Sequence, residues 1–170
     1  MAALKVIPPL SITDSNLTSS TVPETDYSAW SSGTTYTIGQ RVILTSTHKI
    51  YESLQNSNLN KNPATDTSSP PYWIEVSPTN RWKMFDTNNS TQTAQANSIV
   101  VVITPGRVIN SVALLGVEGT SVRIKQTDPT DGVVYDTTFN LNNNGNINNW
   151  YNYFFDPISR KTSVIATDLK

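Results

Sequence analysis

The chain has 170 residues, which is enough for one ordinary domain or two small ones. Only 15% of its residues are charged and the net charge is −1, so nucleic-acid binding and polybasic membrane attachment are not expected, because both need a basic excess. Cysteine is absent, which excludes a disulfide framework and a thiolate zinc site. Pro8 and Pro9 interrupt the apolar N-terminus, so we expect neither a secretory signal peptide nor membrane insertion.

Residues 1–26 read as an extended segment, because Pro8, Pro9 and Pro23 prevent a continuous helix. This segment carries more apolar side chains than a solvated tail would. Those that define a candidate docking arm are Leu4, Val6, Ile7, Leu10 and Ile12. Two interpretations stay open: an N-terminal strand of the local fold, or an arm that packs on a neighbouring subunit.

Residues 27–77 read as a small β domain. Short strands are expected at 34–38 and 40–44, with a break at Gly39, and then at 48–54 and 72–76. Such a domain is too small for a large core, so its aromatic side chains must supply most of the buried area. Its expected core residues are Trp30, Tyr51 and Trp73.

Residues 78–170 read as a second β domain, joined to the first near 77–81. Turn signals such as the DPTDG sequence separate the expected strands. These strands are 99–104, 108–117, 121–126, 133–139, 150–155 and 162–166. Their spacing is typical of a β-sandwich or jelly roll. A jelly roll usually has eight strands, so we expect an all-β chain whose second domain is completed by further sequence or by a partner.

The sequence offers little for catalysis. His48 is the only histidine, and it falls in the expected hairpin loop TSTHK, where we expect a solvated turn residue rather than a member of a catalytic triad. The carboxylates are scattered, and none is singled out as half of a glycosidase pair. We therefore expect no enzymatic activity, no catalytic or metal-binding residue and no cofactor.

One set of residues matches a carbohydrate-binding pattern. The stretch AWSSGTTYTIGQRVILTSTHKIYES, followed by Pro63 and YWIEV, resembles the chitin-binding type 3 modules of chitinases, carbohydrate-binding families 5 and 12. The matching positions are Trp30, Tyr36, Gly39, Val42, Tyr51, Glu52, Pro63 and Trp73. The family carries exposed aromatics that stack on chitin directly after the Tyr51-Glu52 position, whereas this chain has SLQNSN there. The resemblance implies the scaffold of such a module without its binding face.

These aromatics therefore have two interpretations, a sugar-stacking platform or the core of the module. The departure at SLQNSN favours the core for Trp30, Tyr36, Tyr51 and Trp73. Tyr72 is the first candidate for sugar stacking, because in a strand it would point away from the face that Trp73 occupies. Tyr36 is the second candidate.

The whole arrangement resembles a class of tailed-bacteriophage virion proteins. In these proteins an opening like LKVIPPLSITDSNLTSSTVPE precedes such a module, and a segment like PTNRWKMFD leads into a galactose-binding-like jelly roll. The resemblance implies a structural tail component (baseplate, tail tip or fibre attachment) that is assembled in the bacterial cytoplasm. We expect this component to dock through its apolar arm, to contact other tail proteins and to be present in multiple copies. A host-glycan adhesin and a fragment of a polysaccharide depolymerase are the alternatives.

Overall fold

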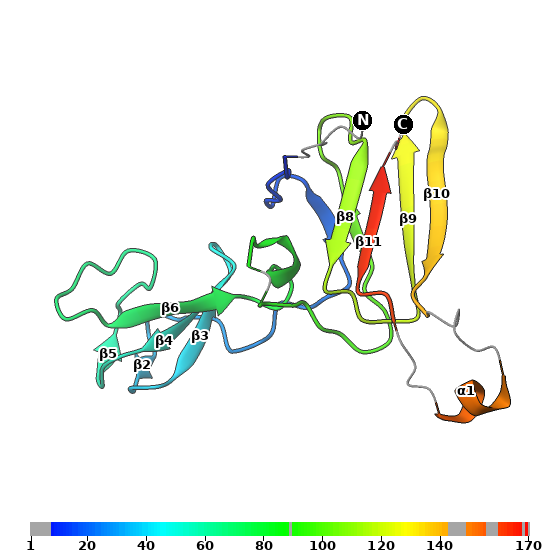
Figure 1. Cartoon of the computed structure of the whole chain (residues 1–170). Helices are drawn as coiled ribbons and strands as arrows, with labels where there is room; N and C mark the ends of the chain where they lie inside the picture. Colours follow the sequence, from blue (N-terminus) through cyan, green and yellow to red (C-terminus); the bar gives the residue numbers. More distant parts are fainter. Residues whose placement is uncertain (1–7, 89, 143–148, 156–159, 168, 170) are drawn as a thin grey trace. The chain divides into compact units, whose positions relative to one another are not determined.

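The computed structural model describes residues 8–88, 90–142, 149–155, 160–167 and 169 (Figure 1). These residues form small antiparallel sheets with one short α-helix, so the chain is mostly β, and within them neither a closed barrel nor a sandwich is identified. Their contacts divide the chain into two units. One unit is Ser11–Thr104, and the other takes in the described residues from Pro105 onward together with residues 8–10. Among the described residues, no helix is long and apolar enough to cross a membrane.

The unit Ser11–Thr104 is built from three small sheets. A three-stranded sheet has the order β3-β4-β6, and two strand pairs, β2-β5 and β1-β7, accompany it. The bounds are β1 Leu17–Ser20, β2 Thr35–Tyr36, β3 Arg41–Leu44, β4 Lys49–Ser53, β5 Asn58–Leu59, β6 Trp73–Pro78 and β7 Val101–Ile103, with a 3-10 turn at Lys83–Phe85. The strands expected at 34–38, 40–44 and 48–54 are present but shorter, the one expected at 72–76 runs from Trp73 to Pro78, and the short strand β5 was not expected.

The core of the small module consists of Tyr36, Val42, Tyr51 and Trp73, which are 1–7% exposed. The rings of Tyr36 and Trp73 meet edge to face with centroids 5.2 Å apart, and the Trp73 indole donates a hydrogen bond to the Lys61 carbonyl at 2.8 Å. Trp30 is half-buried against this cluster. The module therefore uses these aromatic side chains to build its interior.

Gly39 makes the turn between β2 and β3. Its φ is +82°, a left-handed conformation, and its N–H donates to the Ser53 carbonyl at 2.7 Å. A Cβ at this position would meet no atom within 4 Å, so the cost of a side chain comes from the backbone alone. Such a conformation costs an L-residue about 1–2 kcal/mol.

We expect Gly39→Ala to lower the free energy of unfolding of this unit by about 1 kcal/mol. Gly33→Ala is the matched control, because Gly33 has equal space for a Cβ and no left-handed φ. Denaturant unfolding of both variants checks this. Equal midpoints for the two variants would contradict the assignment of Gly39 as a strained turn.

The second unit consists of two antiparallel strand pairs and a helix. Its elements are β8 Ser111–Leu115, β9 Ser121–Asp128, β10 Gly132–Asn140, α1 Trp150–Phe155 and β11 Ser163–Thr167. β9 and β10 form a hairpin across the DPTDG sequence, and Asp128 Oδ1 accepts the N–H of Thr130 at 2.7 Å and that of Asp131 at 3.1 Å. The hairpin turn expected there is confirmed. β8 pairs with β11, and the sandwich expected for this region is not identified among the described residues.

The prediction of a strand at residues 150–155 is wrong, because this segment forms the helix α1. Asn149 begins it: its Oδ1 accepts the Asn152 N–H at 2.8 Å, and its carbonyl accepts the Tyr153 N–H at 3.1 Å. Aromatic residues favour strands by propensity, which explains the error. Here a capping asparagine and ring pairs at i, i+4 decide the local structure instead.

Candidate functional site

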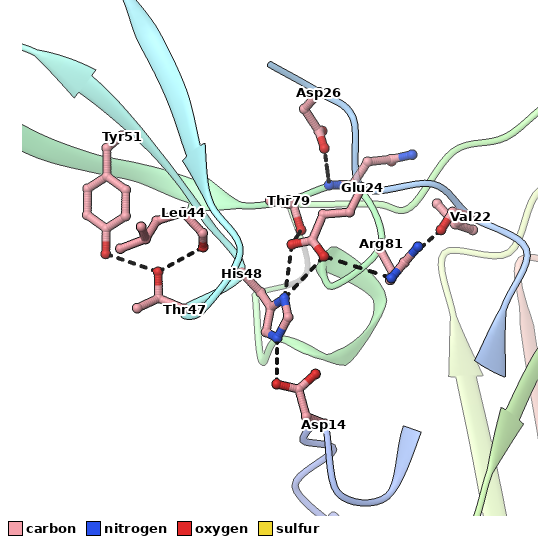
Figure 2. Close-up of polar contacts among 11 residues, drawn as sticks. Asp14, Val22, Glu24, Asp26, Leu44, Thr47, His48, Tyr51, Thr79 and Arg81 are labelled. Carbon is pink, nitrogen blue, oxygen red and sulfur yellow. Dashed lines mark hydrogen bonds and ion pairs between the residues drawn. The ribbon is translucent and has the colours of Figure 1, made fainter. Parts of the chain in front are cut away.

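A network of charged groups centres on His48, in the unit Ser11–Thr104. Figure 2 shows the imidazole between the carboxylates of Asp14 and Glu24. His48 lies in the turn between β3 and β4 with a φ of +56°, a left-handed conformation that histidine adopts more readily than most residues. The two carboxylates come from the segments before and after β1. The network therefore connects the N-terminal segment to the hairpin of the small module.

Both nitrogens of the His48 ring have a carboxylate partner. Nδ1 lies 2.9 Å from Glu24 Oε1, and Nε2 lies 2.9 Å from Asp14 Oδ2. An ionised carboxylate only accepts hydrogen bonds, so the ring can donate to both carboxylates only in its protonated, positively charged form. Its face stacks on Trp82 with centroids 4.2 Å apart and an interplanar angle of 24°. The expectation that His48 is a solvated turn residue is therefore wrong, because its side chain is only 19% exposed.

Glu24 is the hub of the network, and its side chain is 9% exposed. Besides His48 it accepts a hydrogen bond from the Thr79 hydroxyl at 2.9 Å, and its other oxygen lies 3.8 Å from Arg81 Nη1. Thr79 is fully buried. A nearly buried carboxylate therefore has two cations and a hydroxyl group as partners, which offsets its desolvation.

The same region fixes the segment that was expected to be a joint between domains. Arg81 Nε donates to the carbonyl of the fully buried Val22 at 2.7 Å, and the Asp26 carboxylate accepts the Asn80 N–H at 3.0 Å. Residues 79–81 are thus held by residues 22–26 of their own unit. This explains why the division of contacts falls at residues 104–105 and not at 77–81.

The environment of His48 raises its pKa. Burial alone lowers the pKa, but the hydrogen bonds that the ring donates to Asp14 and Glu24 and the charges of these two carboxylates together outweigh it. The positively charged form therefore persists to a higher pH than in a free histidine.

We expect the His48 Hε1 proton to titrate with a midpoint above the value of about 6.5 for free histidine. Because His48 is the only histidine, one NMR resonance reports this without assignment by mutagenesis. Asp14→Asn removes one carboxylate charge and should lower the midpoint. A wild-type midpoint at or below that of free histidine would contradict the network.

This arrangement is suited to holding segments together rather than to acid–base catalysis. A general base needs a free nitrogen within hydrogen-bond reach of a nucleophile, and both His48 nitrogens are used by carboxylates. The nearby Thr79 hydroxyl donates to Glu24 and not to His48. Among the described residues, no group of His, Asp and Glu is placed to hold a metal ion.

The two candidate sugar-stacking residues both lie against the core. Tyr36 is 7% exposed and its hydroxyl accepts the Ser31 N–H at 2.8 Å, so the stacking role expected for it is wrong. Tyr72 precedes β6 and is half-buried against the same cluster, not on the opposite face. The Lys61 ammonium group lies 5.0 Å from the centroid of the Tyr72 ring.

A shallow polar pocket of about 270 Å³ lies in the loop before Tyr72. It is lined by Asn60, Lys61, Asn62, Thr65, Asp66, Thr67 and Ser68. Asp66 accepts the Tyr72 N–H at 2.7 Å and the Ser68 N–H at 3.1 Å. Desolvation raises the pKa of Asp66, but these hydrogen bonds and the charge of Lys61 outweigh it and lower the pKa below its usual value.

The candidate docking arm is only partly covered by the structure. Leu4, Val6 and Ile7 lie outside the described residues. Leu10 and Ile12 are half-buried, Leu10 in the second unit and Ile12 in the unit Ser11–Thr104. From Ser11 onward the N-terminal segment belongs to the local fold, because β1 pairs with β7 and Asp14 contacts His48.

No family model, curated protein or solved structure matches this chain.

Proposed function

We propose that this protein is a non-enzymatic structural component of a bacteriophage tail, which docks through its N-terminal arm and connects or displays other tail parts. In this proposal the small module is a carbohydrate-binding-like scaffold used for architecture, and the second unit is a jelly roll that neighbouring subunits complete. The proposal is supported by the resemblance of the sequence to phage tail proteins and by the exposed apolar surface of the second unit.

The observation that carries the proposal is the small core of that second unit. Its buried hydrophobic residues, among those described, are Leu141, Val164, Ala166 and Leu169. Large side chains on its strands and loops stay open to solvent, with Val108 82% exposed, Leu115 73% and Ile165 61%. Leu115 and Ile165 belong to the paired strands β8 and β11, and contiguous exposed apolar surface marks protein–protein contact sites. A small core with exposed apolar side chains on its strands is what we expect of a subunit whose sheets are covered by its neighbours.

The interior of the small module supports the same conclusion. Its aromatics are used in the Tyr36–Trp73 core, and its single histidine is held by Asp14 and Glu24. The module is thereby firmly joined to the N-terminal segment, as a connecting element requires.

The test is a shortened arm in assembled particles. Deleting residues 2–7 removes Leu4, Val6 and Ile7 and leaves β1, Asp14 and every other described residue in place. We expect the folded variant to be absent from purified virions, whereas Lys5→Ser, which keeps the apolar side chains of the arm, should be incorporated normally. Normal incorporation of the deletion variant would overturn docking through the arm.

A host-glycan adhesin is the second candidate, favoured by the polar pocket beside Tyr72. Its lining offers amide, hydroxyl, carboxylate and ammonium groups next to a half-exposed ring, the combination that sugars use. A glycan array with wild type and Tyr72→Ala separates the candidates: binding lost in the variant would favour the adhesin, and no binding would remove it.

A further inference from the structure

The described residues that precede and follow the segment containing α1 meet in the second unit. Asn142 and Arg160 form an antiparallel bridge, and the Lys161 N–H donates to the Leu141 carbonyl at 2.8 Å. Leu141 is fully buried, so the base of this segment is fixed in the unit. No strand shares an extensive contact with α1 among the described residues. Within the part of the chain that the structure describes, α1 is therefore not packed into a core.

Five of the six residues of α1 are aromatic and exposed. We call them the aromatic helix surface: Trp150 78%, Tyr151 69%, Tyr153 64%, Phe154 65% and Phe155 70% exposed. Their rings contact one another, as in the stacked pair Trp150–Phe154 at 5.8 Å and the pair Tyr151–Phe155 at 4.9 Å. These contacts order the rings while leaving most of their area in water.

The area of this surface is that of a binding interface. At about 150–250 Å² for each aromatic side chain, and with the exposures above, the five rings present roughly 500–850 Å². The largest apolar patch on a typical monomer is about 300–600 Å². One partner of a standard protein interface contributes about 800 Å². A single short helix thus exposes an apolar area of the size of one side of a standard interface.

The absence of charged residues from the helix indicates which kind of partner covers it. α1 carries no acidic and no basic residue, so a charged partner would find nothing to pair with. Helices that bind membrane surfaces carry lysine and arginine on their polar face, and this one has none. Two copies of α1 meet without charge repulsion, and in a two-fold contact the same rings face one another in edge-to-face and offset geometries.

We propose that the aromatic helix surface is a self-association site, through which two copies of this chain pack α1 against α1. The inference goes beyond the proposed tail role, because it concerns the purified chain in solution. It can fail while the docking arm functions, and it can hold if the chain belongs to another assembly.

Sedimentation velocity of the full chain tests the proposal. We expect a monomer–dimer equilibrium between micromolar and hundred-micromolar concentration. The double variant Trp150→Ser, Phe154→Ser should raise the dissociation constant at least about thirtyfold, as loss of interface hot spots does. Ile38→Ser is the matched control, since it removes an exposed apolar side chain (62% exposed) in the other unit, away from any proposed contact surface. A wild type that stays monomeric, or a dimer that the double variant leaves intact, would overturn the proposal.

Cross-linking gives an independent readout that does not depend on the serine variants. The chain has no cysteine, so a single introduced one reports cleanly. Tyr151→Cys should form a covalent dimer on mild oxidation, whereas Ser46→Cys, an exposed position in the other unit, should not. Equal cross-linking of the two would contradict a specific interface. Binding of the monomer to neutral phosphatidylcholine vesicles, lost in the double serine variant, would assign the rings to lipid instead.

Discussion

Replacing Trp73 with alanine should destabilise the unit Ser11–Thr104 by about 3–5 kcal/mol, the usual cost of removing a buried tryptophan. Trp73 is 6% exposed, it meets the Tyr36 ring edge to face, and its indole N–H has the Lys61 carbonyl as acceptor. The variant loses the buried area, the ring contact and the hydrogen bond of Trp73. So small a core has few side chains that could move into the vacated space. Because small domains are stable by only about 5–15 kcal/mol, we expect the module to be largely unfolded at moderate temperature.

Scanning calorimetry of the full chain measures this effect, since two units are expected to give separable contributions. Trp150→Ala is the matched control: the substitution is the same, but Trp150 is 78% exposed, and the transition of the Ser11–Thr104 unit should not move. If both variants unfold like the wild type, Trp73 does not hold the core, and the exposed-platform interpretation of these aromatics returns.

Replacing Glu24 with alanine should cost the same unit about 2–3 kcal/mol near pH 6. The change leaves the His48 Nδ1–H and the buried Thr79 hydroxyl without their acceptor, and it removes the counter-charge next to Arg81. Because folding raises the pKa of His48, its pairing stabilises the unit fully below a pH of about 6.5 and is lost as the pH rises through the folded-state pKa. The cost of Glu24→Ala should therefore be smaller at pH 8.5 than at pH 6.

Glu75→Ala is the control for Glu24→Ala. Glu75 pairs with Lys49 at 2.6 Å, but its side chain is 48% exposed, and exposed pairs contribute only about 0–1 kcal/mol. Denaturant unfolding at both pH values compares the two variants. Equal destabilisation by Glu24→Ala and Glu75→Ala would contradict the view that burial makes the Glu24 contacts stronger. A destabilisation by Glu24→Ala that is the same at pH 6 and pH 8.5 would contradict a contribution from the charged His48.

Sequence patterns located most strands and turns of this chain because those depend on neighbouring residues. The break at Gly39 and the hairpin at DPTDG are local, and both are present in the structure. The network around His48 was not predictable in this way, because Asp14, Glu24 and Thr79 are far from it along the chain and no spacing rule joins them. The helix at Trp150–Phe155 was missed because aromatic strand propensity outweighed a single capping asparagine.

The pairing of β1 with β7 has a consequence for the order of folding. Thr21 and Val100 exchange hydrogen bonds at 3.0 Å beside this pair, so residues 22–99 form a closed loop whose ends meet. Closing so long a loop costs more entropy than forming the β3–β4 hairpin, so we expect the hairpin first and the β1–β7 contact last. Pulsed hydrogen exchange during refolding would show late protection of Thr21. A ribosome-bound chain accordingly cannot complete this unit until Ile103 has emerged, although the hairpin inside it can already form.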